Sequence, residues 1–152
     1  MLRKVIQDTR EKQPWKFSKN KEWCGGTVVK KLDEGDYSIE GMEDRIIIER
    51  KRSTSELVHN FTEKRFWREL ERLNLVEYPF LIAEFSLVDL HQFPVNSGIP
   101  SYLWPRIRLG AGFAIKKFNE MVEDYKISVI FAGNNGKTKA AEILKDFALG
   151  KI

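Results

Sequence analysis

Two acidic side chains and a lysine flank an apolar stretch in a pattern that suits chemistry on phosphate. They lie in the segment GDYSIEGMEDRIIIERK, where Asp36 precedes the first apolar run and Glu49 and Lys51 follow the second. Paired carboxylates repel each other, and a divalent cation that takes hard oxygen ligands is the usual reason for the pairing. A nearby lysine suits the negative charge of a phosphodiester in its transition state. These residue types therefore predict a metal-assisted hydrolytic site.

A β-hairpin would position these three residues. If the turn is symmetric about Met42 and Glu43, the numbers of opposed residues sum to one value, which places Asp36 opposite Glu49. The two Cβ atoms would then be about 4.5–5.5 Å apart. Strand alternation puts Lys51 on the same face as Glu49. The opposite face would be apolar, with Tyr37, Ile39, Ile46 and Ile48.

The rest of the chain predicts an α/β domain around this hairpin. Strands are expected at 4–10, 27–39, 45–51, 77–86 and 127–132. Alternation in the first strand points Asp8 and Arg10 the same way. Helical spacing predicts helices at 53–75, either as one helix or as two broken near Thr62, and at 107–125 and 137–149. A long Pro-rich loop would span 91–107.

Composition sets bounds on the class of protein. The 152 residues, 42% of them apolar, predict a single domain, residues 1–152, with a full core. One cysteine and two histidines exclude a disulfide and a soft-ligand metal site. A net charge of +4 is compatible with a polyanionic partner. Because no signal peptide or membrane-spanning run is seen, we expect a soluble intracellular protein and no membrane partner.

Three motifs in order point to a known family. They are DTRE at residues 8–11, GDY at residues 35–37, and ERK at residues 49–51, followed by STSEL. This set resembles the XPF-type nuclease domain of the restriction-endonuclease-like superfamily, with its motifs Asp-x-Arg-Glu, Gly-Asp-Tyr and Glu-Arg-Lys-x-x-x-Asp. The resemblance implies an α/β restriction-endonuclease-like fold, in which helices flank a mixed central β-sheet.

The same resemblance implies the roles of individual residues. Its site residues are Asp8, Arg10, Asp36, Glu49, Arg50 and Lys51, with Glu11 also in the first motif. Asp8, Asp36 and Glu49 would hold Mg²⁺ or Mn²⁺ and Lys51 would steady the attacked phosphate. Arg10 and Arg50 would organise the site. The products would carry 5′-phosphate and 3′-hydroxyl ends.

The chain departs from the family pattern in two places. Without a gap, the family aspartate that follows Glu-Arg-Lys falls at Ser55, and a one-residue insertion would instead assign it to Glu56. Glu56 also fits a helix capping box with Ser53. The helix-hairpin-helix modules that usually follow the nuclease domain are missing from this sequence, so the expected domain stands alone.

Two functions follow from these observations. The first is a metal-dependent DNA endonuclease that cuts branched, flap or junction DNA in recombination, repair or replication. The alternative is a non-catalytic DNA-binding or dimer-partner module, but a decayed partner should have lost the acidic cluster. We expect a homodimer through the helix at 107–125, whose second apolar edge carries Leu109 and Phe113. Such a protein would be cytoplasmic and associated with the nucleoid, or nuclear in a eukaryote.

The helical region predicted at 53–75 has two interpretations with respect to DNA binding. Arg65 and Arg68 are on one side of it and could bind phosphates. Glu69 and Glu71 lie among them, so a solvated charged face is an equal alternative.

Overall fold

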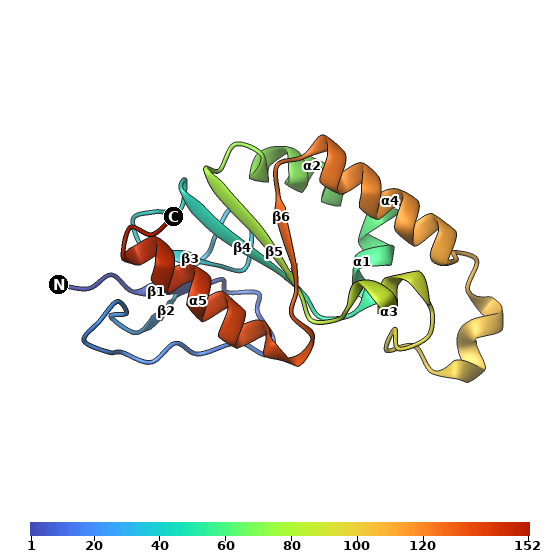
Figure 1. The fold of residues 1–152 in the computed structure, drawn as a ribbon, viewed down its shortest axis with the longest axis horizontal. Coiled ribbons are helices and arrows are strands. Elements are labelled where there is room, and N and C mark those ends of the chain that lie inside the picture. Colours follow the sequence, from blue (N-terminus) through green and yellow to red (C-terminus); the bar gives the residue numbers. More distant parts are fainter.

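Six strands form one mixed sheet with helices on both faces (Figure 1). The computed structural model describes residues 1–152. The strands, in sheet order, are β2 (Thr27–Val29), β1 (Val5–Gln7), β3 (Tyr37–Ile39), β4 (Ile46–Lys51), β5 (Tyr78–Ala83) and β6 (Ser128–Phe131). The helices are α1 (Thr54–Phe61), α2 (Lys64–Leu73), α3 (Leu87–His91), α4 (Ala111–Asp124) and α5 (Gly136–Ala148). The predicted α/β class and mixed sheet are confirmed.

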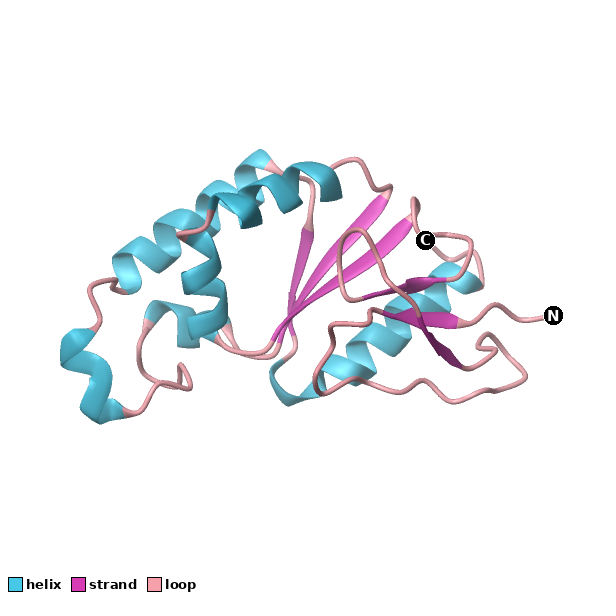
Figure 2. Cartoon of the chain, turned by 180° about the vertical axis from the view of Figure 1, so that it is seen from behind, coloured by secondary structure: helices cyan, strands magenta, loops and turns pink.

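The sheet separates two hydrophobic cores, and helices lie on both sides of it (Figure 2). On one face, Ile47 and Leu81 pack against apolar residues of α1, α2 and α4. On the other, Ile46, Ile48 and Ile82 pack against α5 and the loop that carries Trp15, Phe17 and Cys24. Because both faces of β4 are covered, its six residues are all buried, including the charged ones at its end.

The predicted hairpin register is confirmed. Strands β3 and β4 are antiparallel and pair Tyr37 with Ile48, which sets Asp36 opposite Glu49. The Asp36 amide donates to the Ile48 carbonyl at 2.8 Å and Asp36 Oδ2 accepts from the Arg50 amide at 2.7 Å, so these bonds hold Asp36 beside Glu49. Tyr37 and Ile48 belong to the core under α5, as the alternation predicted. The carboxylate pair therefore faces the layer that contains α1 and α2.

The expected single strand at 27–39 is wrong. The chain forms β2, parallel to β1 at the edge of the sheet, and returns on the other side of β1 as β3. Between them Leu32 is buried, and its amide donates to Asp8 Oδ1 at 2.8 Å. A tertiary hydrogen bond from the first motif thus interrupts a stretch that looked continuous in the sequence.

The helices follow the predicted pattern with shifted ends. The 53–75 region divides at Thr62 into α1 and α2, one of the two alternatives. Helix α4 begins at Ala111 rather than Ile107, because residues 101–106 form a separate 3-10 turn that contains Pro105. No helix combines the length and the apolar character needed to cross a membrane.

Candidate active site

The carboxylate pair and Lys51 meet at the end of the hairpin, under helix α2. The Glu49 side chain is 7% exposed, and its Oε1 lies 3.3 Å from Lys51 Nζ. Lys51 Nζ also lies 5.1 Å from the centre of the Phe66 ring on α2. Asp36 Oδ2 accepts a hydrogen bond of 2.7 Å from the backbone amide of Arg50. Contacts from strand β4 and helix α2 therefore hold these three side chains in place.

These groups open into two adjoining polar cavities. One has a volume of about 290 Å³ and the other about 370 Å³. The residues that line both are Arg10, Asp36, Glu49, Lys51 and Asn60. The larger of the two has no hydrophobic side chain in its lining. Such walls suit a charged, hydrated ligand such as a phosphate group better than an apolar molecule.

Burial and mutual repulsion perturb the acidic groups of this site. Burial raises the pKa of Asp36 to about 6. Burial, followed by the charge of Asp36, raises the pKa of Glu49 to about 7. For Lys51, burial works to lower the pKa, but Glu49 and neighbouring carboxylates outweigh it and raise the pKa, so the ammonium stays charged. Carboxyls whose pKa values are raised by burial, beside a charged lysine, are typical of functional sites.

These pKa shifts predict how stability depends on pH without metal. A raised pKa means that the folded state retains protons that the unfolded state has released, so stability falls as pH rises from the unfolded values to about 6 and about 7. Asp36→Asn removes one of the two groups and should flatten this fall. At neutral pH it should stabilise the metal-free protein by about 0.2–1 kcal/mol, the cost of like charges opposed on a sheet. Urea unfolding in EDTA across this pH range measures both effects.

Added metal should reverse the advantage of this variant. Binding stabilises only as far as affinity allows, so Asp36→Asn should gain less than wild type from Mn²⁺. A variant that is less stable than wild type in EDTA, or equally stabilised by Mn²⁺, would show that Asp36 and Glu49 do not share an ion.

The structure does not bring Asp8 to the cavity. Asp8 is 1% exposed, and its Oδ2 lies 2.7 Å from Arg10 Nε while its Oδ1 accepts from the Leu32 amide. Burial works to raise the pKa of this carboxyl, but the hydrogen bonds from Arg10 and Leu32 outweigh it and lower the pKa. Both oxygens are therefore engaged in holding the loop and Arg10. The predicted grouping of Asp8 with Asp36 and Glu49 as shared ligands is not what the geometry shows.

Arg10, by contrast, lies at the mouth of both cavities. Its side chain is 64% exposed although its Nε is fixed by Asp8 and its Nη2 donates to the Leu32 carbonyl at 3.1 Å. A guanidinium held at its base and open to solvent at its edge is suited to contact a phosphate oxygen. The first motif thus supplies an oriented cation rather than a third carboxylate.

Arg50 is directed away from Glu49 and Lys51, onto the other face of β4. Its Nε lies 2.6 Å from Glu84 Oε1, and its Nη1 lies 3.0 Å from Glu11 Oε2. The guanidinium also stacks 4.2 Å from the centre of the Trp15 ring. Glu11 in turn accepts a 2.7 Å hydrogen bond from the Tyr37 hydroxyl. The side chain of Arg50 therefore joins the first, second and third motifs beneath the sheet, while its backbone amide holds Asp36 and the residue also lines the 370 Å³ cavity.

The two residues considered for the third-motif aspartate occupy different places. Ser55 Oγ donates to the Ser97 carbonyl at 2.7 Å, away from the carboxylates. Glu56 lines the 370 Å³ cavity with Asp36 and Glu49. Its amide donates to Ser53 Oγ and its carboxylate accepts from the Arg52 amide at 3.2 Å. Glu56 thus combines a helix-capping contact with a position on the cavity wall.

The predicted DNA-binding arginines differ in their relation to the site. Arg65 lines the 290 Å³ cavity, with 81% of its side chain exposed, and pairs with Glu63 at 2.9 Å. Arg68 is exposed on α2 but does not line the cavity. Only Arg65 therefore has a place at the rim.

Glu69 on α2 and Asn60 on α1 both line the 290 Å³ cavity. Neither was among the site residues predicted from the sequence. A signal for Glu69 existed, since it follows Phe66 by three residues and precedes Leu70, at the edge of the buried stripe of α2. Burial and the charge of Glu49 raise the pKa of Glu69 to about 8. The sequence left a solvated charged face and a phosphate-binding face as equal alternatives for this side of the helix, and neither predicts a place for Glu69 in the cavity.

The donors at the site fit a hard divalent cation. Glu49 Oε2 is buried and has no hydrogen-bond partner, and Asp36 lies beside it. A buried carboxylate oxygen without a partner is costly unless an ion or proton compensates it. No three His, Cys, Asp or Glu side chains are arranged as a ready-made cage. The oxygen chemistry therefore fits Mg²⁺ or Mn²⁺ through Asp36 and Glu49.

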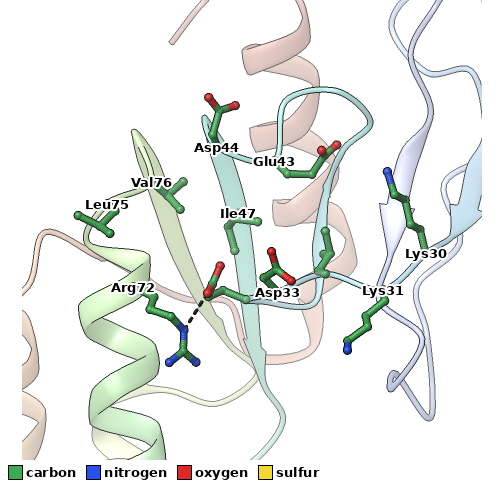
Figure 3. Close-up of a pocket in the computed structure, with 11 residues that line it drawn as sticks. Lys30, Lys31, Asp33, Glu43, Asp44, Ile47, Arg72, Leu75 and Val76 are labelled. Atoms are coloured by element: carbon green, nitrogen blue, oxygen red, sulfur yellow. Dashed lines mark hydrogen bonds and ion pairs between the residues drawn. The ribbon is translucent and has the colours of Figure 1, made fainter.

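A larger cavity lies beside the site on the same side of the sheet (Figure 3). Its volume is about 590 Å³, and it shares Asp33 and Arg72 with the 290 Å³ cavity. Arg72 Nε lies 2.7 Å from Glu34 Oε1, the dashed interaction in Figure 3. Its charged lining residues are Lys30, Lys31, Asp33, Glu34, Glu43, Asp44 and Arg72. This mixture of charges is poorly suited to a phosphate backbone, so the chemistry is assigned to the smaller cavities.

Comparison with known proteins agrees with the resemblance found in the sequence. A family model described as the ERCC4 domain matches residues 7–138. A curated Methanocaldococcus jannaschii protein named "Putative ATP-dependent RNA helicase" is 36% identical over 101 residues, which cover 66% of this chain and 12% of that protein. The chain thus corresponds to a small part of that relative.

Two solved structures of XPF from Aeropyrum pernix share the fold. The first has a TM-score of 0.62 at 20% identity and covers 96% of this chain and 65% of its own. The second, a complex with DNA, has a TM-score of 0.61 at 19% identity and covers 98% of this chain and 66% of its own. At such identity the likeness shows the fold alone.

Proposed function

This chain belongs to the ERCC4 domain family, the family of XPF-type nuclease domains, and from that premise we propose that it is a Mg²⁺- or Mn²⁺-dependent DNA endonuclease. Its substrate would be branched DNA: a flap, a fork or a junction between single-stranded and double-stranded segments. Such DNA arises in repair, recombination and replication, and the protein would act where that DNA is, in the cytoplasm with the nucleoid or in a nucleus.

One observation carries this proposal. The β3–β4 register sets Asp36 opposite Glu49 at the wall of a polar cavity, with Lys51 Nζ 3.3 Å from the Glu49 carboxylate. A cross-strand ion pair on the surface would not bury Glu49 or raise the pKa values of both carboxyls. Two carboxyls and one cation at a solvent-accessible cavity are groups that metal-assisted phosphodiester hydrolysis requires.

Each residue would have a distinct part in the reaction. Asp36 and Glu49 would hold the ion, which supplies an activated water and a Lewis acid when bound. Lys51, kept charged by its carboxylate neighbours, would stabilise the growing negative charge on the attacked phosphate. Arg10 would hold a neighbouring phosphate at the cavity mouth, and Asp8 would orient Arg10. Arg65 would add a contact at the rim.

The direct test is a panel of labelled DNA substrates. Duplex, flap, fork and four-way DNA would be incubated with the purified protein in Mg²⁺, Mn²⁺ or EDTA. Metal-dependent nicking that is strongest on one branched substrate is the expected result, with 5′-phosphate and 3′-hydroxyl ends on the products. Binding to branched DNA without cleavage under every metal condition would instead support a non-catalytic DNA-binding or partner module.

We also propose that the active form is a homodimer through α4. Val122 on α4 is 39% exposed and Tyr102 in the preceding 3-10 turn is 78% exposed. Leu109 and Phe113 are half-buried at the edge of the core, so part of each stays available for a partner. Light scattering is expected to give twice the monomer mass. A monomer at high concentration would remove this proposal and leave these side chains to the core or to DNA.

A further inference from the structure

The 290 Å³ cavity contains more carboxyl groups than its unpaired cations can neutralise. Its carboxyls are Asp33, Asp36, Glu49 and Glu69. Each of its three arginines is paired with an acid that does not line the cavity: Arg10 with Asp8, Arg65 with Glu63 and Arg72 with Glu34. Lys51 is therefore the one cation directed at the buried carboxyls. A bound cation would supply the missing charge.

Glu69 approaches this group from the helix rather than from the sheet. It lies on α2 and lines the same cavity as Glu49. Asp36 and Glu49 line that cavity from the hairpin. Three carboxyls from the hairpin and a helix therefore line one cavity.

Two buried oxygens at the same cavity lack partners. Glu49 Oε2 accepts no hydrogen bond, although only 7% of the side chain is exposed. Asn60 Oδ1 is also buried without a partner, while Asn60 Nδ2 donates to the Glu63 carboxylate at 3.0 Å. A carboxylate and a carboxamide oxygen are both common ligands of hard cations. Unpaired oxygens of this kind indicate a ligand that binds between α1, α2 and the hairpin.

We propose that Glu69 is a further carboxylate of the metal site, so that a bound Mg²⁺ or Mn²⁺ joins helix α2 to the β3–β4 hairpin. This inference rests on the proposed metal-dependent function. No three acidic side chains form a cage in the structure. The ion would thus draw Glu69 toward Glu49 and Asp36, and the position of α2 over the cavity would depend on it.

Calorimetric titration of Mn²⁺ into the full chain tests this inference without any substrate. Glu69→Gln keeps the size of the side chain and removes its charge. It should raise the Kd for Mn²⁺ by at least about 10-fold, because even a residue that only hydrogen-bonds a metal ligand typically contributes that much to metal affinity. Glu71→Gln is the matched control, because Glu71 is exposed on the same helix and does not line the cavity, and its Kd should equal that of wild type.

The outcomes separate this inference from the proposed function. If wild type and Glu69→Gln bind Mn²⁺ equally, Glu69 is not part of the site, although the nuclease proposal stands. If wild type binds no Mn²⁺, both fail. Melting in EDTA checks the fold of Glu69→Gln, which should be at least as stable as wild type because a like charge is lost. If that variant does not fold, hydrogen exchange of wild type decides: Mg²⁺ should slow exchange across Lys64–Leu73, and unchanged exchange there would overturn the inference.

Discussion

Glu49→Gln and Asp36→Asn are each expected to lower the rate of DNA cleavage by at least about 10²–10³-fold, the loss typical of removing one preorganised charge-stabilising group. The amides are close in size to the carboxylates, and the Asn side-chain oxygen can still accept from the Arg50 amide, as Asp36 Oδ2 does at 2.7 Å. The hairpin should therefore keep its geometry and lose its charge. Single-turnover cleavage of the preferred branched DNA in Mg²⁺ measures this effect.

A matched control is available on the same hairpin. Glu40 follows β3 and is exposed, so Glu40→Gln should cut at the wild-type rate. DNA affinity in Ca²⁺ or EDTA should be nearly unchanged in both site variants, because the phosphate contacts proposed for Arg10 and Arg65 do not involve either carboxylate. Cleavage at wild-type rate by either site variant would show that the metal is held elsewhere.

Arg50→Ala is expected to destabilise the protein more than any surface change. Arg50 is buried between Glu11, Glu84 and Trp15, with ion pairs of 3.0 and 2.6 Å. Removing one member of a buried ion network leaves uncompensated charge, which costs about 3–5 kcal/mol. In a domain of this size the Tm should fall by roughly 6–20 °C. Urea unfolding and a thermal melt would measure the loss.

Arg68→Ala is the control for that experiment. Arg68 is exposed on α2, and its replacement should change stability little. Arg50→Ala should also reduce cleavage, since Arg50 joins the loop of Glu11 to the strand of Glu49, but only in proportion to the folded fraction at temperatures near its melt. A stable Arg50→Ala protein that is inactive would instead place the guanidinium in the chemistry.

The hairpin was the part of the fold that the sequence specified best. Strand alternation has a period of two, and the turn between Ile39 and Ile46 leaves little freedom in register. Those local rules sufficed to place Asp36 opposite Glu49 before any tertiary contact was known. The helices were equally accessible, because apolar spacing in α2 and α4 follows directly from one buried face.

Contacts between residues distant in the chain could not be predicted from such local rules. Strand alternation determines the face of Arg50 but not its partners, since Glu11 is 39 residues before it and Glu84 is 34 residues after it. Asp8 follows β1, so its side chain is set by hydrogen bonds to Arg10 and Leu32 rather than by the pleat. The division of 27–39 into two strands has the same cause. Motif membership identified these residues without indicating what they contact.

Glu69 shows a different limit. A glutamate among arginines on a helix has the composition of a solvated face, and its burial arises only when β4 lies beneath α2. A polar residue at the edge of an apolar stripe is the sequence feature that deserved weight. The role of such a residue depends on which charged residues of the neighbouring strand lie next to it in the folded protein.

The glycine ahead of Asp36 sets a limit on how far the motif can be altered. Gly35 has a φ of +80°, and a Cβ built there would collide with the Ile47 Cγ2 atom and approach the Ile48 carbonyl oxygen at 3.3 Å. Any larger residue would have to push the two strands apart at the very step where their acids face each other. The absence of a Cβ at position 35 therefore sets the distance between the two strands beside the acidic pair. A methyl group at this position would increase that distance and is expected to reduce catalysis, although no charged residue is replaced.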